Sequence, residues 1–545
     1  MKETKQTFVK GAFILIFANL LVKIIGAVFK IPLTNSIGTL AMSYFNQAYS
    51  YYALFFMIST AGLPVAISRI VAAANVRGNR REVEKIYSVA MRLFFIIGLA
   101  GSLILVIFSG VISNAVAVPE LYMCIITIAP TLFFICLTSA CRGYFQGLQN
   151  MIPTAASQTI EALGKLIIGL AAAVWAKSRG YSDAAVACFA LSGITVGVVL
   201  SFVFCYISKR RSSAAYGPVP RMKTRSARSI GRELIGIAIP ITLSSSIMYL
   251  NTVIDSSLVI SRLIAQGYDK EIAQKFFGAY SSMAVTLYNL PPNFINPFAI
   301  SLIPQISANI AKGAVKATKH VMDSTLRICS TIIIPCAFGM GALSERIVGL
   351  LFTNEDITVD ALGRVIGSVP LAGGLLKVLA PSIFLVSILY VTSAMLQATG
   401  NERLSIISAL SGIATKLVSS FILLSIPALG IYATPISTTL CYLVILVCNT
   451  LFLVKTTGYR PSLRRIYLKP LIAGIACGAS ALLFARFFDL FLPAKLGTLA
   501  SIVFAALVYL AVLLLIKGLD RGDVALLPFG KKILAVLDRF HLLGK

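Results

Sequence analysis

Long apolar segments, separated by short polar ones, follow one another along almost the whole chain. Most of them hold about twenty residues, the length that a helix needs to cross the hydrocarbon core of a bilayer. They lack the alternation of apolar and polar positions that marks transmembrane β-strands. Lipid offers an exposed backbone no hydrogen bonds, so such segments must be helices. The pattern predicts fourteen transmembrane helices, at residues 8–30, 43–68, 87–112, 121–145, 154–176, 184–207, 234–260, 277–304, 321–343, 374–398, 404–425, 431–454, 470–490 and 497–516.

The composition supports this interpretation. Hydrophobic residues make up 58% of the chain and charged residues only 12%, whereas a soluble domain carries about 25% charged residues. The ten cysteines fall almost entirely within apolar segments and form no Cys-x-x-Cys pair, so they indicate neither a metal site nor a disulfide framework. We therefore expect an all-α polytopic membrane protein that uses no cofactor and no metal.

The net charge of +28 follows from how basic residues are divided between the loops. Most of the 48 Lys and Arg residues lie in alternate loops, on the side that includes both termini and a central basic loop at 208–231. By the positive-inside rule, that side faces the cytoplasm. We expect a multi-pass protein of the bacterial cell membrane whose basic loops contact anionic lipids. The same distribution argues against nucleic acid as a partner.

The chain also repeats itself at an offset of 251 residues. Ala-Pro-Thr-Leu-Phe at 129–133 matches Ala-Pro-Ser-Ile-Phe at 380–384. In the same register, Gln146 matches Gln397, Asn150 matches Asn401 and Lys165 matches Lys416. Six predicted spans separate the copies, so both cross the membrane in the same direction, as in transporters built from parallel repeats.

The repeat predicts the domain organisation. We expect two pseudo-symmetric six-helix lobes at 1–207 and 232–456, joined by a basic cytoplasmic linker at 208–231. Residues 457–545 would add two transmembrane helices and a cytoplasmic tail. Two such lobes leave a cleft between them that can open alternately to each side of the membrane. We expect this unit to be a monomer.

Charged residues inside the predicted spans are the first candidates for function. On insertion scales a cation at the centre of a bilayer costs about 2.5–3.5 kcal/mol, so it must face water, a partner or an anionic ligand. The charged residues within spans are Lys23, Arg92, Glu161, Lys165, Asp255, Arg327, Lys377 and Lys416. Cations outnumber acids among them, which favours an anionic substrate.

These residues admit two interpretations. Arg92, Arg327 and Lys377 lie near span ends, where a long side chain can reach the interface. The other three cations lie deeper, and we expect them to face a cavity.

The two acids also leave alternatives open. Glu161 and Lys165 are four residues apart on one helix face, so a local ion pair is a competing explanation for both. Asp255 could pair with Lys416 or bind a coupling cation.

Helix-breaking residues cluster in two spans. Span two contains Pro64, and span eight contains three prolines and three asparagines within residues 289–297. Proline frees backbone carbonyls, which a membrane protein tolerates where other helices or cavity water satisfy them. We expect span eight to be broken and to line a cavity, and a packed kink without any ligand is the alternative.

Several short motifs resemble one known family along essentially the whole chain. The chain resembles the multidrug/oligosaccharidyl-lipid/polysaccharide flippase superfamily, and within it the branch of stage V sporulation protein B and the Bacillus-type lipid II flippase. The motifs are Lys23-Ile-Ile-Gly26-Ala-Val-Phe29-Lys30-Ile-Pro32, Ala61-Gly62-Leu63-Pro64-Val-Ala-Ile-Ser68-Arg69, Arg142-Gly-Tyr-Phe-Gln146-Gly147 and Met395-Leu-Gln397-Ala-Thr-Gly400-Asn401.

The resemblance implies a flippase that moves an undecaprenyl-pyrophosphate-linked oligosaccharide, such as lipid II or another cell-envelope polysaccharide precursor. Lipid II flippases carry an Arg-x-x-Gly-x-x-Arg-Asp pattern in span one, whose cations serve the pyrophosphate. Lys23 and Gly26 match the first Arg and the Gly, whereas Phe29 and Lys30 replace the Arg-Asp. Because no nucleotide-binding Gly-x-x-x-x-Gly-Lys-Ser/Thr motif occurs, we expect the membrane potential or an ion gradient to drive transport.

Motifs and intramembrane charges together give two sets of candidate residues. We expect substrate contacts from Lys23, Arg69, Arg92, Arg142, Lys165, Asn289, Asn293 and Lys416. We expect gating or coupling roles for Pro64, Gln146, Glu161, Asp255, Pro291, Pro292 and Gln397.

Two other functions remain open at this level. A multidrug/cation antiporter of the same fold would use Glu161 or Asp255 as its proton carrier. A membrane-embedded glycan polymerase or ligase would need catalytic groups at the outer face, where the longest loop is short and mostly apolar. The polymerase would also leave the repeat unexplained, so we expect a transporter rather than an enzyme.

Overall fold

The computed structural model describes residues 8–215, 223–353, 356–359 and 365–518. The middle of the predicted linker, 216–222, and the predicted tail from residue 519 lie outside them. The described chain is helical apart from one short hairpin, and it forms two compact units, 1–278 and 279–545. The all-α polytopic fold class is confirmed.

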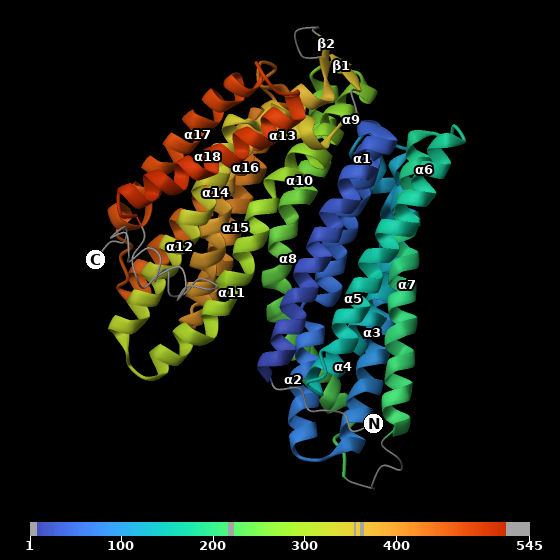
Figure 1. Cartoon of the computed structure of the whole chain (residues 1–545). Coiled ribbons are helices and arrows are strands. Elements are labelled where there is room, and N and C mark those ends of the chain that lie inside the picture. Colours follow the sequence, from blue (N-terminus) through green and yellow to red (C-terminus); the bar gives the residue numbers. More distant parts are fainter. Residues whose placement is uncertain (1–7, 216–222, 354–355, 360–364, 519–545) are drawn as a thin grey trace. The chain divides into compact units, whose positions relative to one another are not determined.

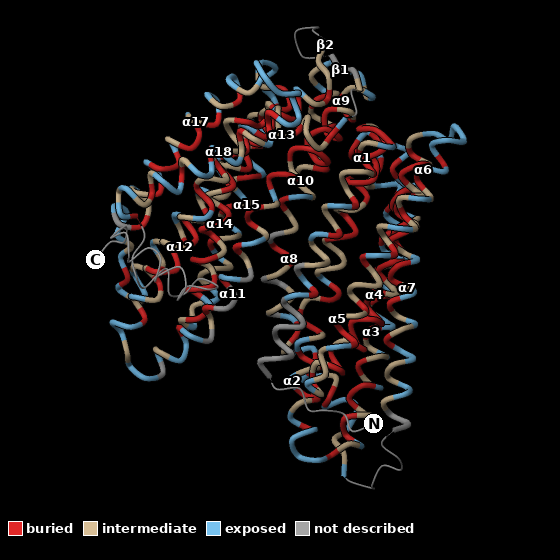
Figure 2. The backbone as a smooth tube through the Cα atoms, viewed as in Figure 1, coloured by how far each residue is buried: buried red, intermediate tan, exposed pale blue. Residues whose placement is uncertain are grey.

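The first unit is built around α4, which packs against α1, α2, α3 and α7. Because other helices surround it, α4 is buried along most of its length (Figure 2). Helices α3 and α7 expose apolar residues such as Ile107 and Val203, as lipid-facing spans do. The elements are α1 (Phe8–Thr60), α2 (Leu63–Val76), α3 (Arg80–Ala115), α4 (Leu121–Gly147), α5 (Ile152–Gly164), the π-helical η1 (Lys165–Gly169), α6 (Leu170–Ser178), α7 (Asp183–Ala215), α8 (Ala227–Ala265) and α9 (Lys270–Gly278).

Helices α8 and α9 belong to the first unit because they pack on α1. Gly62, between α1 and α2, allows α8 to come close, because a Cβ there would lie 2.1 Å from the carbonyl oxygen of Ala238. The backbone N–H of Gly62 also donates to Thr242 Oγ1 at 3.2 Å. The boundary between the two compact units lies after Gly278 in the sequence. The six-helix lobes drawn from the repeat stay a prediction.

The second unit is centred on α14, which packs against α11, α12, α13 and α16 (Figure 1). Its elements are the π-helical η2 (Ala279–Ala284), α10 (Val285–Tyr288), α11 (Leu290–Ala311), α12 (Val315–Ala342), α13 (Ser344–Leu351), β1 (Ile357–Val359), β2 (Val365–Gly367), α14 (Ser368–Ala398), α15 (Glu402–Leu423), the 3₁₀ turn η3 (Gly430–Tyr432), α16 (Ala433–Thr457), the π-helical η4 (Arg464–Leu468), α17 (Lys469–Phe488) and α18 (Ala494–Leu515). The antiparallel hairpin pairs Ile357 with Gly367, and the sequence pattern did not predict it.

Twelve helices in the described residues are long and apolar enough to cross a membrane. The first candidate, Phe17–Val76, covers two predicted spans. Its 60 residues would extend about 90 Å as a straight helix, roughly three times the hydrocarbon thickness. The helix is broken at Gly38, whose φ of 86° lies in the left-handed region. The predicted eighth span is not among the twelve.

The eighth span is broken, as the sequence predicts. The chain passes from α9 through the π-helical η2 into α10, and α11 starts anew after Asn289. Pro291 and Pro292 lie in the first turn of α11, where their missing N–H groups leave no helical hydrogen bond unmade.

The repeat is visible in the two central helices. Helix α4 ends at Gly147 and α14 at Ala398, 251 residues later. The N–H of Asn150 donates to the Phe145 carbonyl at 3.0 Å, and the N–H of Asn401 donates to the Leu396 carbonyl at 2.9 Å. Both caps place a left-handed residue just before that asparagine, so both are Schellman motifs. The predicted sequence repeat is therefore also a repeat of backbone structure.

The last two helices pack on the second unit through small side chains. Ala473, Ala481 and Ala485 on α17 form a buried cluster with Tyr509 and Leu513 on α18. The Tyr509 hydroxyl donates to the Thr331 carbonyl on α12 at 2.7 Å.

An ion pair also ties α13 to the end of α17. Arg346 donates to the Asp489 carboxylate at 2.5 and 2.8 Å, and these hydrogen bonds lower the pKa of Asp489. The pair is partly exposed, so packing contributes more to this attachment than charge does.

Candidate substrate-binding site

Arg142 is the centre of a polar network inside the first unit. It extends from α4 between α5 and α7, and its Nε donates to Ser157 Oγ at 2.9 Å. One terminal nitrogen lies 2.8 Å from Glu161 Oε2 and 3.2 Å from Ser201 Oγ. The guanidinium is mostly buried and Glu161 is less so. A buried cation needs both a counter-charge and hydrogen bonds, and here α5 and α7 supply them.

Lys165 follows Glu161 by one helical turn but does not form an ion pair with it in the described structure. Its Nζ lies 4.8 Å from the ring centroid of Phe29 and 5.1 Å from that of Tyr49. Aromatic faces attract cations electrostatically, and more strongly where water is excluded. The predicted alternative of a local Glu161–Lys165 ion pair is therefore replaced by a Glu161–Arg142 pair and a lysine held between rings.

Local backbone structure places Lys165 there. Residue 165 begins the π-helical turn η1, and such turns are frequent at functional sites. The neighbouring helix α7 comes very close, since a Cβ on Gly164 would lie 2.4 Å from the Cα of Gly197. At a second crossing, a Cβ on Gly193 would lie 2.2 Å from the Cα of Gly169. Small residues allow membrane helices to approach this closely.

Helix α1 adds two more cations. Lys23 and Lys30 are both half-buried, and Lys30 directly follows Phe29, whose ring Lys165 contacts. Lys30 is absent from the predicted site because it lies at the end of the first predicted span. Its spacing of seven residues from Lys23 places both on one face of a helix, and that signal could have identified it. Ser157, Ser201 and the two rings are also additions from the structure.

The other candidates of the first unit lie apart from this network. Arg69 is exposed on α2, and Arg92 lines a separate groove between α3 and α8. Pro64 lies in the first turn of α2. Gln146 and Asp255 are half-buried on α4 and α8. The structure thus brings Arg142, Glu161 and Lys165 together, and the roles of the remaining candidates stay predictions.

In the second unit, Lys416 is the repeat partner of Lys165 and is only 1% exposed. Its Nζ donates to Thr438 Oγ1 on α16. The helices α15 and α16 also approach closely, because a Cβ on Gly412 would lie 2.1 Å from a side-chain carbon of Ile445. The repeat therefore has a lysine at a helix crossing in each unit, half-buried at Lys165 and fully buried at Lys416.

The predicted residues of the eighth span take different positions. Asn289 is exposed and its amide donates to the Val285 carbonyl at 2.8 Å, while Asn293 is half-buried. Pro291 and Pro292 are buried, and Gln397 is exposed near the end of α14. The structure supports the break in the helix, whereas contact of these side chains with a ligand stays a prediction.

The second unit also contains a long apolar groove of about 1060 Å³, between α12, α14, α16 and α17. Phe338, Phe384, Leu443 and Leu482 are among the residues that line it, and Lys377 is its one charged lining residue. A groove of this kind suits a hydrocarbon chain better than a sugar.

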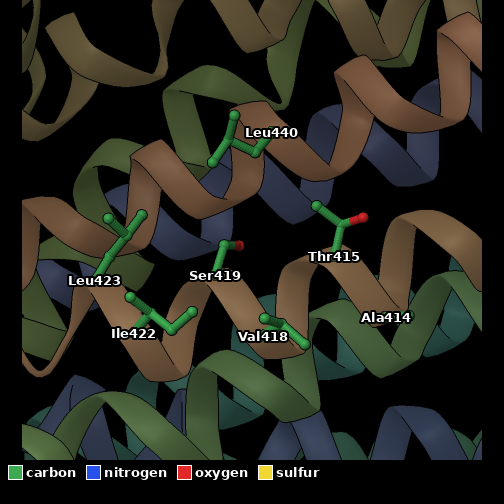
Figure 3. Close-up of a pocket in the computed structure, with 7 residues that line it drawn as sticks. All are labelled: Ala414, Thr415, Val418, Ser419, Ile422, Leu423 and Leu440. Atoms are coloured by element: carbon green, nitrogen blue, oxygen red, sulfur yellow. The ribbon is translucent and has the colours of Figure 1, made fainter.

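A smaller hollow of about 530 Å³ lies on α15 and α16 (Figure 3). Its lining is Ala414, Thr415, Val418, Ser419, Ile422, Leu423 and Leu440, without any charged side chain. Val418 and Ile422 are largely exposed, as lipid-facing residues are, so this hollow is not part of the candidate site. No group of three or more His, Cys, Asp or Glu suited to a metal occurs in the described residues.

Comparison with known proteins places the chain in a family. A family model described as polysaccharide biosynthesis protein matches residues 8–310, more than half of the chain. This chain belongs to the polysaccharide biosynthesis protein family. The resemblance stated from its motifs is thereby confirmed.

Two relatives of this family member come from Bacillus subtilis strain 168. Stage V sporulation protein B is 26% identical, with 78% of this chain and 80% of the relative covered. The lipid II flippase MurJ is 24% identical, with 83% of each covered.

Solved structures show the same fold. The inward closed conformation of the lipid II flippase MurJ superposes with a TM-score of 0.67 at 17% identity, covering 91% of this chain and 97% of that one. An inward-facing multidrug resistance MATE family transporter of the MOP superfamily gives 0.65 at 14% identity, covering 81% and 98%. The named flippase and transporter share the fold of this multi-pass family member, and they favour the predicted transporter over an enzyme.

Proposed function

We propose that this protein is a flippase for a pyrophosphate-bearing, polyprenyl-linked oligosaccharide, the class that includes lipid II. The observation that carries the proposal is the group of cations inside the spans of the first unit. Lys23 and Lys30 on α1, Lys165 on η1 and Arg142 on α4 outnumber the one carboxylate of the network, Glu161. Such a group is costly in a membrane and is retained where it meets an anion.

The substrate consists of a pyrophosphate, a polyprenyl chain and an oligosaccharide. The chain offers a binding counterpart for the first two. A pyrophosphate needs cations, which α1, α4 and η1 provide. A polyprenyl chain needs an apolar path, and the groove lined by α12, α14, α16 and α17 is of that kind. The family and the named relatives support a lipid-linked substrate over a free sugar.

Transport would then proceed by alternating access, with the two parts of the lipid held in different surroundings. The cations bind the head group while the polyprenyl chain stays in apolar surroundings, and the two halves of the repeat exchange the side to which the site is open. The membrane potential or an ion gradient supplies the driving force. We place both termini in the cytoplasm of a bacterial cell, so the head group moves from the cytoplasmic to the outer leaflet.

The test is a reconstituted flipping assay with purified full-length protein in liposomes. We expect flipping of fluorescent lipid II or of a polyprenyl-linked teichoic acid precursor, and which one is faster identifies the substrate. Lys23→Ala and Lys165→Ala should each lower the rate at least tenfold. Lys495→Ala, an exposed lysine at the start of α18, is the matched control.

Two outcomes would refute the proposal. One is that neither lipid is flipped above the rate of empty liposomes. The other is that both lysine variants flip at the wild-type rate while remaining folded. An antiporter predicts instead that cells producing the protein gain drug resistance and that Asp255→Asn removes it.

A further inference from the structure

A second basic site lies outside the network just described, in a groove between α3 and the start of α8. The groove has a volume of about 1010 Å³. Arg92 on α3 and Arg228 and Arg232 on α8 line it, and all three are exposed. Neither Arg142 nor Lys165 takes part. Three guanidinium groups from two helices therefore converge on one accessible space.

The one acid in this groove does not cancel their charge. Glu233 also lines the groove, but its carboxylate is bound by Arg225, which at the same time binds Glu82. The first turn of α8 adds its N-terminal dipole, which also favours negative charge. The groove is thus electropositive, and its three arginines are available to a ligand with several anionic oxygens.

The height of the groove matches the surface of a bilayer. Residues 93–115 of α3, which follow Arg92, contain no charged side chain. They extend about 34 Å as a helix, enough to cross the hydrocarbon core. Arg92 therefore lies where lipid headgroups lie, at the end of α3 that we assign to the cytoplasmic side.

An apolar stripe begins in the groove and continues along α3. Ile96 lines the groove, and Leu99, Leu103 and Ile107 follow at helical spacing on the same face. All four are exposed, Ile107 at 70%. Val89 and Leu93 also line the groove, and a Cβ on Gly231 would lie 4.0 and 3.9 Å from their side chains, so α8 packs on α3 here at ordinary contact distance. Cations at one end of an exposed apolar stripe are complementary to a phospholipid, and a free phosphate would not need the stripe.

We propose that this groove binds the anionic headgroup of a phospholipid of the cytoplasmic leaflet, with its acyl chains along α3. The site assigns Arg92 to a membrane lipid and not to the transported substrate. It does not depend on the proposed flippase function, because an antiporter of the same fold would have the same groove. Arginine suits this role because its planar fork binds phosphate oxygens in pairs.

Native mass spectrometry of the full-length protein tests the proposal. The protein is released from detergent micelles that contain phosphatidylglycerol, phosphatidylcholine or both, and bound lipids are counted as their concentration rises. We expect tighter retention of phosphatidylglycerol than of phosphatidylcholine. The triple variant Arg92→Gln, Arg228→Gln, Arg232→Gln should weaken that retention at least tenfold.

A matched control separates this site from general attraction by basic loops. Arg81→Gln, Arg210→Gln, Arg211→Gln removes the same charge from three exposed arginines that do not line the groove, and it should retain the lipid as wild type does. Inorganic phosphate at 10 mM should not displace phosphatidylglycerol.

Three results would overturn the proposal: equal retention by the two triple variants, equal retention of the two lipids, or displacement by inorganic phosphate, which would indicate a free-anion site. If the groove variant does not stay monodisperse, the single variants Arg232→Gln and Arg92→Gln carry the test. Each should lower retention about threefold, and no change in either also refutes the site.

Discussion

Three intramembrane cations of this chain are accommodated in three different ways. Arg142 has a carboxylate and two hydroxyls, Lys165 has two ring faces, and Lys416 has a threonine hydroxyl. Desolvating a charge costs several kcal/mol, and an ion pair recovers this cost only when its geometry is good. Arg142 meets this condition, because its guanidinium has a carboxylate and two hydroxyls as partners.

This difference predicts a non-additive mutant cycle. Arg142→Met should destabilise the protein by about 2–4 kcal/mol, because it leaves the Glu161 carboxylate without its counter-charge. Glu161→Met alone should cost a similar amount, and the double variant should cost less than the sum of the two. Reversible unfolding in mixed detergent micelles measures all four proteins. Additive losses would contradict the importance of this pair.

The residues of this site could be predicted from the sequence only in part. Lys23, Lys165 and Lys416 are identifiable because a cation in an apolar segment is anomalous by itself. The partner of Glu161 is not, because the spacing of four points to Lys165 whereas Arg142 is 19 residues away on another helix. The packing of α4, α5 and α7 decides whether Glu161 contacts Arg142 or Lys165. A local sequence pattern does not reveal that packing.

At the scale of elements, glycine crossings decide how close the helices are. Where α5 and η1 cross α7, Gly164 faces Gly197 and Gly169 faces Gly193 with no room for a Cβ. The break in the eighth span could be predicted because proline and asparagine act locally. The interruption at Gly38 falls in the polar gap between the first two predicted spans. The π-helical turn η1 could not be predicted, because apolar residues continue through it.

Gly164→Ala should therefore destabilise the first unit by about 1–3 kcal/mol, as overpacking does. The added methyl group would meet backbone atoms, which cannot rotate away. Gly110→Ala on α3 is the control, because a Cβ there meets nothing within 4 Å. It should be neutral or stabilising by up to about 1 kcal/mol, since alanine favours a helix. Thermal unfolding in detergent compares the two, and equal midpoints would show that the crossing can relax.

For the whole molecule, hydrophobic pattern and charge bias were the strongest guides. They predicted a polytopic helical protein, which the structure contains. The repeat could be found because helix ends and one proline of each central helix, Pro130 and Pro381, recur in one register. The assignment of α8 and α9 to the first unit depends on contacts between distant segments, such as Gly62 with Ala238, and no periodicity reveals these.

The positive-inside distribution makes a prediction at this scale. Ser178, at the end of α6, should face the outside, and Arg211, near the end of α7, should face the cytoplasm. In intact cells a membrane-impermeant maleimide should label Ser178→Cys but not Arg211→Cys, which should react only after permeabilisation. The ten native cysteines are buried or half-buried and give the background. The reverse pattern would mean that the orientation is wrong.

The two Schellman caps let each residue of one half be compared with its counterpart. Lys165 has Lys416, but Arg142 corresponds to Ser393 and Glu161 to Gly412. Where the first half holds an ion pair, the second has a hydroxyl that accepts from Asn449 and a glycine pressed against Ile445. The two halves thus share one backbone scaffold but differ in their charged side chains. Mutations of the ion pair in the first half can therefore be compared with the uncharged positions that correspond to it in the second half.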